Sequence, residues 1–158
     1  MAEPAAAVRD DLSAVHLWLV LWKTHDAVRG HAEQSIRQLG MCLTDFGILE
    51  LLLHKGPLPV NTVGGKLGLT SGSATTAIDR LVERGLVARR VDASDRRARI
   101  VALTRAGRGC IEPAFAEHAS AMERAASVLS AQERAWLLTL LKRLGRHAQH
   151  ENTNHDRS

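Results

Sequence analysis

The chain has no Tyr, only two Phe and three Trp, and two cysteines, Cys42 and Cys110. Two cysteines this far apart make neither a metal-binding pair nor a disulfide framework, and they suit a reducing compartment. No stretch approaches the roughly 20 apolar residues of a membrane-spanning helix. Residues 1–7 lack the positive segment and apolar core of a signal peptide. We therefore expect a cytoplasmic protein with no membrane partner.

The motifs of several enzyme classes are also missing. The sequence has no phosphate-binding P-loop, no Gly-x-Ser-x-Gly nucleophile turn and no His-Glu-x-x-His helix. We expect neither an enzyme nor a cofactor. Among eight histidines, only His147 and His150 have close ligand spacing, and they run into a polar end. Adventitious metal binding is favoured there over metal sensing, so no metal site is predicted.

The positive charge is concentrated in the middle of the chain. Residues 44–109 carry 11 Lys and Arg against 6 Asp and Glu, a net charge of +5, whereas the whole chain of 158 residues has a net charge of +4. Such a segment is attracted to phosphate, because neutralising phosphates releases their counterions. Double-stranded DNA is therefore the expected partner.

A basic hairpin is the most informative part of this segment. Residues 87–91 and 99–103 have the pattern of two short strands, and residues 92–98 form the turn between them. Four arginines fall within nine residues: Arg89, Arg90, Arg96 and Arg97. Guanidinium groups on a narrow hairpin suit an electronegative minor groove. The alternative is a solvated arginine-rich hairpin without a ligand.

Upstream of the hairpin, residues 70–84 are predicted to form a helix that starts at hydroxyl residues and ends at Gly85. Its apolar residues recur at helical spacing and can face a core. The remaining face carries polar groups suited to reading base edges in a major groove: Ser71, Ser73, Thr75, Thr76 and Arg80.

Two apolar segments, residues 44–54 and 60–67, come before this helix, with a breaker at residues 55–59. The Gly-containing turn at residues 67–70 then completes a helix-turn-helix, in which residues 70–84 are the recognition helix. Gly64 and Gly65 weaken the helix predicted for residues 60–67. They indicate either close helix packing or a short helix.

The residues around the hairpin resemble those of a known family. The run from Leu81 to Val87, then Arg90, Asp95 to Arg97 and Leu103 to Gly107, resembles the MarR-type (multiple antibiotic resistance regulator) winged-helix repressors over about residues 12–147. The resemblance implies a homodimer whose recognition helices enter successive major grooves. It also implies that Arg97 reaches a minor groove and is braced by Asp95. Residues 44–73 further resemble regulators of quinone and hydroquinone resistance.

The predicted fold is mainly α with a small β-hairpin wing. Residues 1–148 are expected to form one domain, in which residues 44–108 are a winged helix-turn-helix lobe and residues 11–39 and 109–147 are dimerisation helices. The alternative is that these helices pack only on their own lobe. Pro113 is expected to kink the second of them or to mark its start. Residues 149–158 are polar and are predicted to be disordered.

Most of the few aromatic residues fall on the segments where the family commonly binds ligands. Their arrangement permits an apolar pocket for a small aromatic effector, although core packing is the better explanation for any one of these residues. The candidates are Trp18, Trp22, His25, Phe46 and Phe115. Cys42 precedes a helix, so it is either a reactive thiol or a buried inert one.

These observations together predict a dimeric DNA-binding transcriptional regulator. We expect a repressor that leaves a roughly palindromic operator when a small phenolic or quinone-like effector binds. Two alternatives stay open: a thiol-based redox sensor that uses Cys42, and a non-specific architectural DNA-binding protein.

Overall fold

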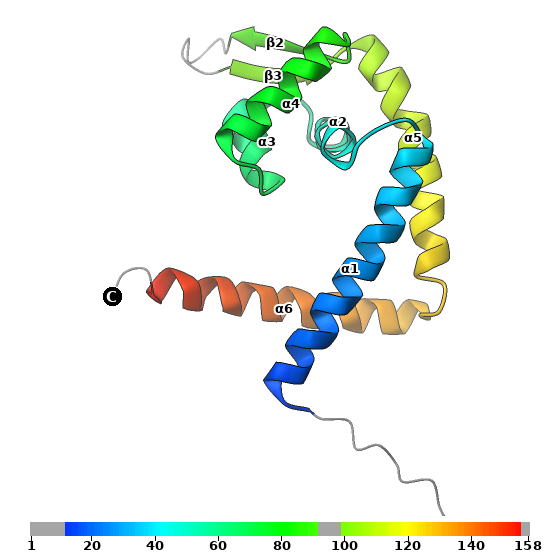
Figure 1. Cartoon of the computed structure of the whole chain (residues 1–158), viewed down its shortest axis with the longest axis vertical. Helices are drawn as coiled ribbons and strands as arrows, with labels where there is room; N and C mark the ends of the chain where they lie inside the picture. The colour runs from blue at the N-terminus through cyan, green and yellow to red at the C-terminus, as the bar shows by residue number, and fades with distance from the viewer. Residues whose placement is uncertain (1–11, 92–98, 156–158) are drawn as a thin grey trace, which may run out of the picture. The chain divides into compact units, whose positions relative to one another are not determined.

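The computed structural model describes residues 12–91 and 99–155 and shows a mainly helical chain with a small antiparallel sheet (Figure 1). The chain divides into two compact units, residues 1–122 and 123–158. The elements follow the order α1 Ala14–Gln38, α2 Leu43–Lys55, β1 Leu58–Pro59, α3 Val60–Lys66, α4 Ser71–Glu83, β2 Val87–Val91, β3 Arg99–Leu103, α5 Arg105–Ala125 and α6 Ala131–His155. This is the winged-helix fold that the sequence predicts.

The recognition helix α4 begins and ends at the predicted signals. The Thr70 hydroxyl accepts a hydrogen bond from the Ser73 backbone N–H at 3.2 Å and caps the N-terminus. At the other end the Gly85 N–H donates to the Val82 carbonyl at 2.8 Å, and the Leu86 N–H donates to the Leu81 carbonyl at 2.9 Å. This pair of bonds is a Schellman motif, and it requires the φ of +69° that Gly85 adopts.

The sheet has the strand order β1-β3-β2, and both pairs of strands are antiparallel. Strands β2 and β3 match the predicted strands, with Arg89 opposite Val101 and Val91 opposite Arg99. Strand β1 corrects the prediction of a simple breaker at residues 55–59. Its two residues pair with the free edge of β3, Leu58 opposite Val101 and Pro59 opposite Ile100, and so short a strand has no pattern of its own in the sequence.

The core of the first unit lies between α2, α4, the sheet and the start of α5. Its largest buried side chains include Phe46 and Leu49 of α2, Ile78 and Leu81 of α4, and Ile111 of α5. Helix α3 has seven residues, and a Cβ on Gly64 would lie 3.1 Å from the Ala74 Cβ. Both explanations offered for the two glycines therefore hold, because the helix is short and Gly64 packs closely against α4.

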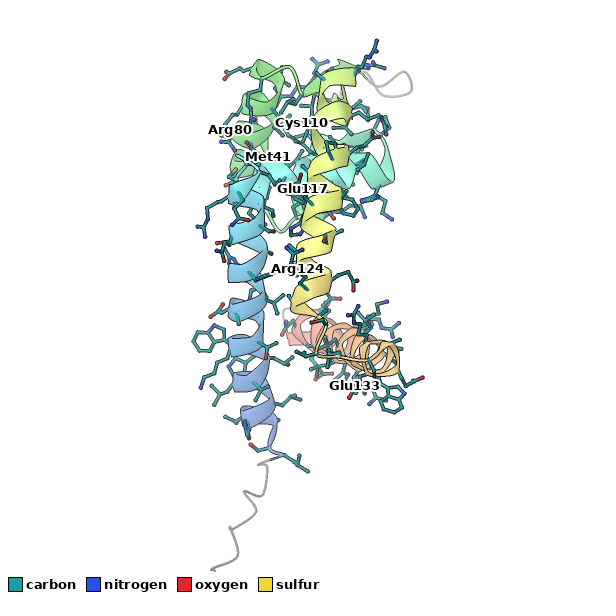
Figure 2. The ribbon with its side chains drawn as sticks, turned by 90° about the vertical axis from the view of Figure 1, so that its right-hand side faces the viewer. Met41, Arg80, Cys110, Glu117, Arg124 and Glu133 are labelled. Carbon is teal, nitrogen blue, oxygen red and sulfur yellow. The ribbon has the colours of Figure 1, made fainter. Side chains whose placement is uncertain are left out.

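Helices α1 and α5 run side by side in the first unit, as Figure 2 shows. The His31 Nε2 lies 3.0 Å from the Ala121 carbonyl oxygen, and the Ser35 hydroxyl lies 2.7 Å from the His118 Nδ1. Helix α1 starts at Ala14, later than predicted, because Ser13 caps it by accepting from the His16 N–H at 3.2 Å. Helix α5 starts at Arg105, so Pro113 lies inside the helix and does not mark its start.

The second unit contains α6, whose N-terminus is a capping box. The Ser130 N–H donates to the Glu133 carboxylate at 2.8 Å, and the Glu133 N–H donates to the Ser130 hydroxyl at 3.3 Å. The prediction of disorder from residue 149 is wrong for residues 149–155, because α6 continues to His155. Those residues include no Gly or Pro to end the helix, so their polar composition does not by itself indicate disorder.

Candidate DNA-binding surface

The polar face of α4 is exposed as the sequence predicts. Ser71, Ser73, Thr75 and Thr76 are exposed, whereas the apolar residues at helical spacing between them are buried. Thr70 also donates its hydroxyl proton to the Ser73 oxygen at 2.8 Å, which occupies the Ser73 side chain in the cap. The side chains of Thr75 and Thr76 therefore offer the more accessible hydrogen-bonding groups for base edges.

Arg80 lies on the flank of α4, where it pairs with Asp45 of α2. The Arg80 Nε donates to Asp45 Oδ2 at 3.2 Å, and its Nη2 donates to Oδ1. The carboxylate hydrogen bond and its negative charge raise the pKa of Arg80 above the usual value. Arg80 is therefore permanently charged and already has a protein partner, although the sequence placed it among DNA-contacting residues.

Asp45 itself is not among the site residues that the sequence predicts. It is 2% exposed, and it is the buried charged side chain of the described parts of the chain. Arg84, one turn after Arg80, also donates to its Oδ2, at 3.2 Å. The signal in the sequence was an acidic residue in the first turn of a strongly apolar helix, with two arginines spaced by one turn on another helix.

The first two arginines of the hairpin differ in their surroundings. Arg89 of β2 forms an ion pair with Asp79 of α4. Arg90 and Arg99 are exposed on the paired strands, β2 and β3. Asp95, Arg96 and Arg97 lie outside the described residues, so their predicted roles stay predictions.

A hollow of about 830 Å³ opens between α3, the start of α4 and the two strands of the hairpin. The predicted DNA-binding residues Ser71, Thr75 and Arg89 line it. Asn61 and Arg99 line it as well, although no pattern in the sequence marks them as DNA-binding residues. The structure thus gathers hydroxyl and guanidinium groups from three elements around one concave surface, which is the mixture that phosphate and base edges require.

The five candidate effector residues fall into two groups. Trp18 and Trp22 stack on each other along α1 with ring centroids 6.1 Å apart, and both are more than half exposed. His25 is exposed and lies 3.5 Å from Asp26. Phe46, in contrast, is 1% exposed. Within one chain the buried Phe46 therefore has different surroundings from the three exposed residues of α1.

Phe46 and Phe115 each contact a histidine that the prediction left out of the site. The Phe46 ring meets His118 edge-on with centroids 4.9 Å apart, and Phe115 meets His54 in the same way at 4.7 Å. His118 is also the residue that approaches Ser35 of α1. These contacts form an aromatic cluster where α1, α2 and α5 come together.

The thiol of Cys42 is exposed, which removes the alternative of a buried inert cysteine. Cys42 is the N-cap residue of α2, and the Arg80 Nη2 lies 3.7 Å from its sulfur. Figure 2 shows Arg80 next to the connection between α1 and α2, where Met41 is labelled. A chemical change at this sulfur would therefore occur beside the arginine that joins α4 to α2.

Residues 12–91 and 99–155 include no group of three or more His, Cys, Asp or Glu side chains arranged to hold a metal ion. No helix within those ranges is both long enough and apolar enough to cross a membrane.

Comparison with known proteins places the chain in a family. The MarR family model matches residues 42–98. The HTH-type transcriptional regulator MhqR of Bacillus subtilis is 34% identical over 135 residues, which cover 85% of this chain and 93% of that protein. The chain belongs to the MarR family. As a member of this family it is a DNA-binding transcriptional regulator, and the recognised relatives are regulators rather than enzymes.

Solved structures show the same fold. A probable transcriptional regulator from Pseudomonas aeruginosa superimposes with a TM-score of 0.70 and 29% identity, over 81% of this chain and 96% of that chain. CouR from Rhodococcus jostii, solved with bound p-coumaroyl-CoA, superimposes with a TM-score of 0.73 and 24% identity, over 89% of this chain and 95% of that chain. The fold of these solved structures therefore extends over most of this chain.

Proposed function

We propose that this MarR-family regulator is a homodimeric repressor that binds a roughly palindromic operator through α4 and the β2–β3 wing. The hollow lined by Ser71, Thr75 and Arg89 carries the proposal, because it joins the start of the recognition helix to the base of the wing. Short hydroxyl side chains suit base edges in the major groove, and the arginines suit phosphates and the minor groove.

Exposed apolar side chains support the dimer. Helix α1 carries Val15, Leu19 and Trp22, and α6 carries Trp136 and Leu140, all of them at least 42% exposed in the single chain. Apolar surface on two long helices is costly in water, and burial against a second copy removes that cost. A two-fold symmetric dimer presents two recognition helices, and such symmetry matches a palindromic site.

The proposed effector is a small phenolic or quinone-like molecule that binds near the aromatic cluster of Phe46, Phe115 and His118. Aromatic rings favour the edge-on contacts that Phe46 and Phe115 already make, and a flat ring bound beside them would gain contacts of the same kind. CouR, of the same fold, is solved with an aromatic acyl-CoA. Binding can release DNA only to the extent that the effector prefers the conformation that DNA disfavours.

A second candidate for sensing is oxidation of Cys42. The observation that favours it is the exposed sulfur 3.7 Å from the Arg80 guanidinium, because a larger or charged sulfur group would disturb the contact between α2 and α4. Mass spectrometry after mild peroxide treatment, run beside an operator-binding assay, separates the two. Release of DNA by phenols from a Cys42→Ser variant supports the effector, whereas release by oxidation that this variant abolishes supports the thiol.

Selection of DNA tests the central proposal. The wild-type protein would select duplexes from a random-sequence library, and its affinity for the selected duplex would be compared with that for a shuffled duplex of equal length and composition. A specific regulator should prefer the selected duplex by about 10³-fold or more at the same salt concentration. Similar affinities for the two duplexes would identify a non-specific architectural protein instead.

A further inference from the structure

The contact between α2 and α4 has an unusual charge arrangement. The carboxylate of Asp45 is 2% exposed and accepts hydrogen bonds from two arginines of α4, Arg80 and Arg84. We call these three residues the Asp45 clamp. Both oxygen atoms of the carboxylate are used, because Arg80 contacts each of them and Arg84 contacts Oδ2.

Stability alone does not account for a buried ion pair at this position. Removing a carboxylate from water costs free energy that its partners only partly return, and apolar residues of similar volume often stabilise a core equally well. Apolar contacts, however, do not fix the orientation of the groups that they join. A planar guanidinium that donates through two nitrogens to one carboxylate holds a defined orientation.

A second ion pair holds the adjacent flank of the same helix. Asp79 of α4 pairs with Arg89 of β2, and Asp79 and Arg80 are neighbours in sequence. Neighbouring residues of an α-helix project about 100° apart around its axis. One pair therefore ties α4 to α2 and the other ties α4 to the wing, so that rotation of α4 about its axis stretches at least one of them.

We propose that Asp45 is a positioning residue for DNA recognition, which acts without touching DNA by holding the rotation of α4 through Arg80 and Arg84. The inference rests on the proposed function, because it assumes that the exposed face of α4 reads the operator. Thr75 and Thr76 meet base edges only at one rotation of the helix. Non-specific binding does not depend on this rotation, because the positively charged side chains around α4 attract phosphate at any rotation of the helix.

The test compares affinity for a selected duplex and for a shuffled duplex across a range of NaCl concentrations, with the full-length protein. In Asp45→Asn, the carboxylate is replaced by an amide of the same size. The preference for the selected duplex should fall by about tenfold or more, the scale of one lost base contact. Affinity for the shuffled duplex should stay the same or rise, because Arg80 and Arg84 lose their counter-charge.

Glu112→Gln is the matched control. Glu112 pairs with Arg108 within α5, and both side chains are more than half exposed. The control changes the net charge by the same amount away from α4, so it should leave the preference within about twofold of the wild-type value. A folded Asp45→Asn dimer that behaves like this control would overturn the inference.

Arg80→Lys keeps the test decisive if Asp45→Asn does not fold. The Arg80 side chain is 45% exposed, so a lysine there can remain solvated and charged. Lysine cannot donate to both carboxylate oxygens in the forked geometry. The preference of the Arg80→Lys variant for the selected duplex should therefore also fall. An unchanged preference would refute the positioning role of the Asp45 clamp.

The double variant separates positioning from a direct contact of Arg80 with DNA. If Arg80 acts through Asp45, adding Arg80→Lys to Asp45→Asn should change the preference by no more than about twofold. If Arg80 contacts DNA itself, the two losses should multiply, and the inference fails. If the wild-type protein itself showed no preference for the selected duplex, the proposed function would fail together with this inference. If the wild type and the variants shared an unchanged preference, the inference would fail and the proposed function would stand.

Discussion

Arg89 of β2 and Asp79 of α4 form an ion pair that connects the wing to the recognition helix. The acidic partner lies on the helix predicted to approach DNA, and it compensates one of the charges that phosphate would attract. The Arg89 side chain is 31% exposed and that of Asp79 is 47% exposed, so solvent weakens the pair.

Neutralising Asp79 should therefore strengthen general DNA binding. In Asp79→Asn, Arg89 becomes available to phosphate, and affinity for all duplexes should rise with a steeper dependence on salt. Thermal unfolding should shift little, because an exposed pair contributes at most about 1 kcal/mol. A selective loss of affinity for the selected duplex would show instead that Asp79 contributes to recognition, either by reading a base or by holding α4 against the wing.

Substitutions on the exposed face of α4 should change which sequences are preferred. Thr75→Ala and Thr76→Ala each remove a hydroxyl that faces away from the core, and a lost base contact costs about 1–3 kcal/mol at the affected position. Binding assays with single-base variants of the selected duplex would reveal a changed ranking. Arg90→Ala should instead lower affinity for every duplex and reduce the salt slope by about one. Equal losses across all duplexes for both kinds of variant would contradict the helix assignment.

The wing prediction depends on Arg97, which lies outside the described residues. Arg97→Ala should weaken operator binding by about 1–3 kcal/mol, because a guanidinium in a narrow minor groove is lost. Asp95→Ala should act in the same direction with a smaller effect. Circular dichroism and sedimentation would establish that the dimer remains folded. Unchanged affinity of a folded Arg97→Ala dimer at moderate salt would remove the wing from the mechanism.

Two glycine substitutions should have opposite effects on stability. Gly85 has a φ of +69°, so Gly85→Ala should lower the free energy of unfolding by about 1–2 kcal/mol. Gly145 lies inside α6 with open space around it, and Gly145→Ala should raise helix stability by about 0.5–1 kcal/mol. Thermal melting of the two variants beside the wild type checks both signs. A destabilised Gly145→Ala protein would indicate that a second chain packs against that position.

The capping box of α6 makes a prediction about pH. Hydrogen bonds from the Ser130 hydroxyl and the Ser130 N–H lower the pKa of Glu133. A carboxylate with a lowered pKa in the folded state stabilises that state above its unfolded pKa, and this contribution disappears as pH falls through the folded value. An NMR titration of the Glu133 carboxyl should show the low pKa in the wild type and a higher one in Ser130→Ala. Equal values in the two proteins would rule out the hydrogen bond from the Ser130 hydroxyl to the Glu133 carboxylate.

The local signals in the sequence predicted the local structure well. Thr70 and Gly85 marked both ends of α4, and the strands on either side of residues 92–98 fell where the β pattern predicted them. What the sequence could not supply was the choice of partner. The sequence around Arg80 is the same whether its side chain contacts DNA or Asp45, because a separation of 35 positions along the chain gives no information about distance in space. The contact between the Phe46 and His118 rings could not be predicted for the same reason.

Strand β1 has a consequence for how the wing can vary. It joins the hairpin through backbone pairing of only two residues, Leu58 and Pro59, with Val101 and Ile100 of β3. Backbone pairing depends little on which side chains occupy the exposed positions of β2 and β3. Mutations can therefore exchange those side chains while the base of the hairpin keeps its direction. Descendants of one ancestral regulator can thus diverge toward different target sequences through exposed positions of the wing, with no need to rebuild the fold at each step.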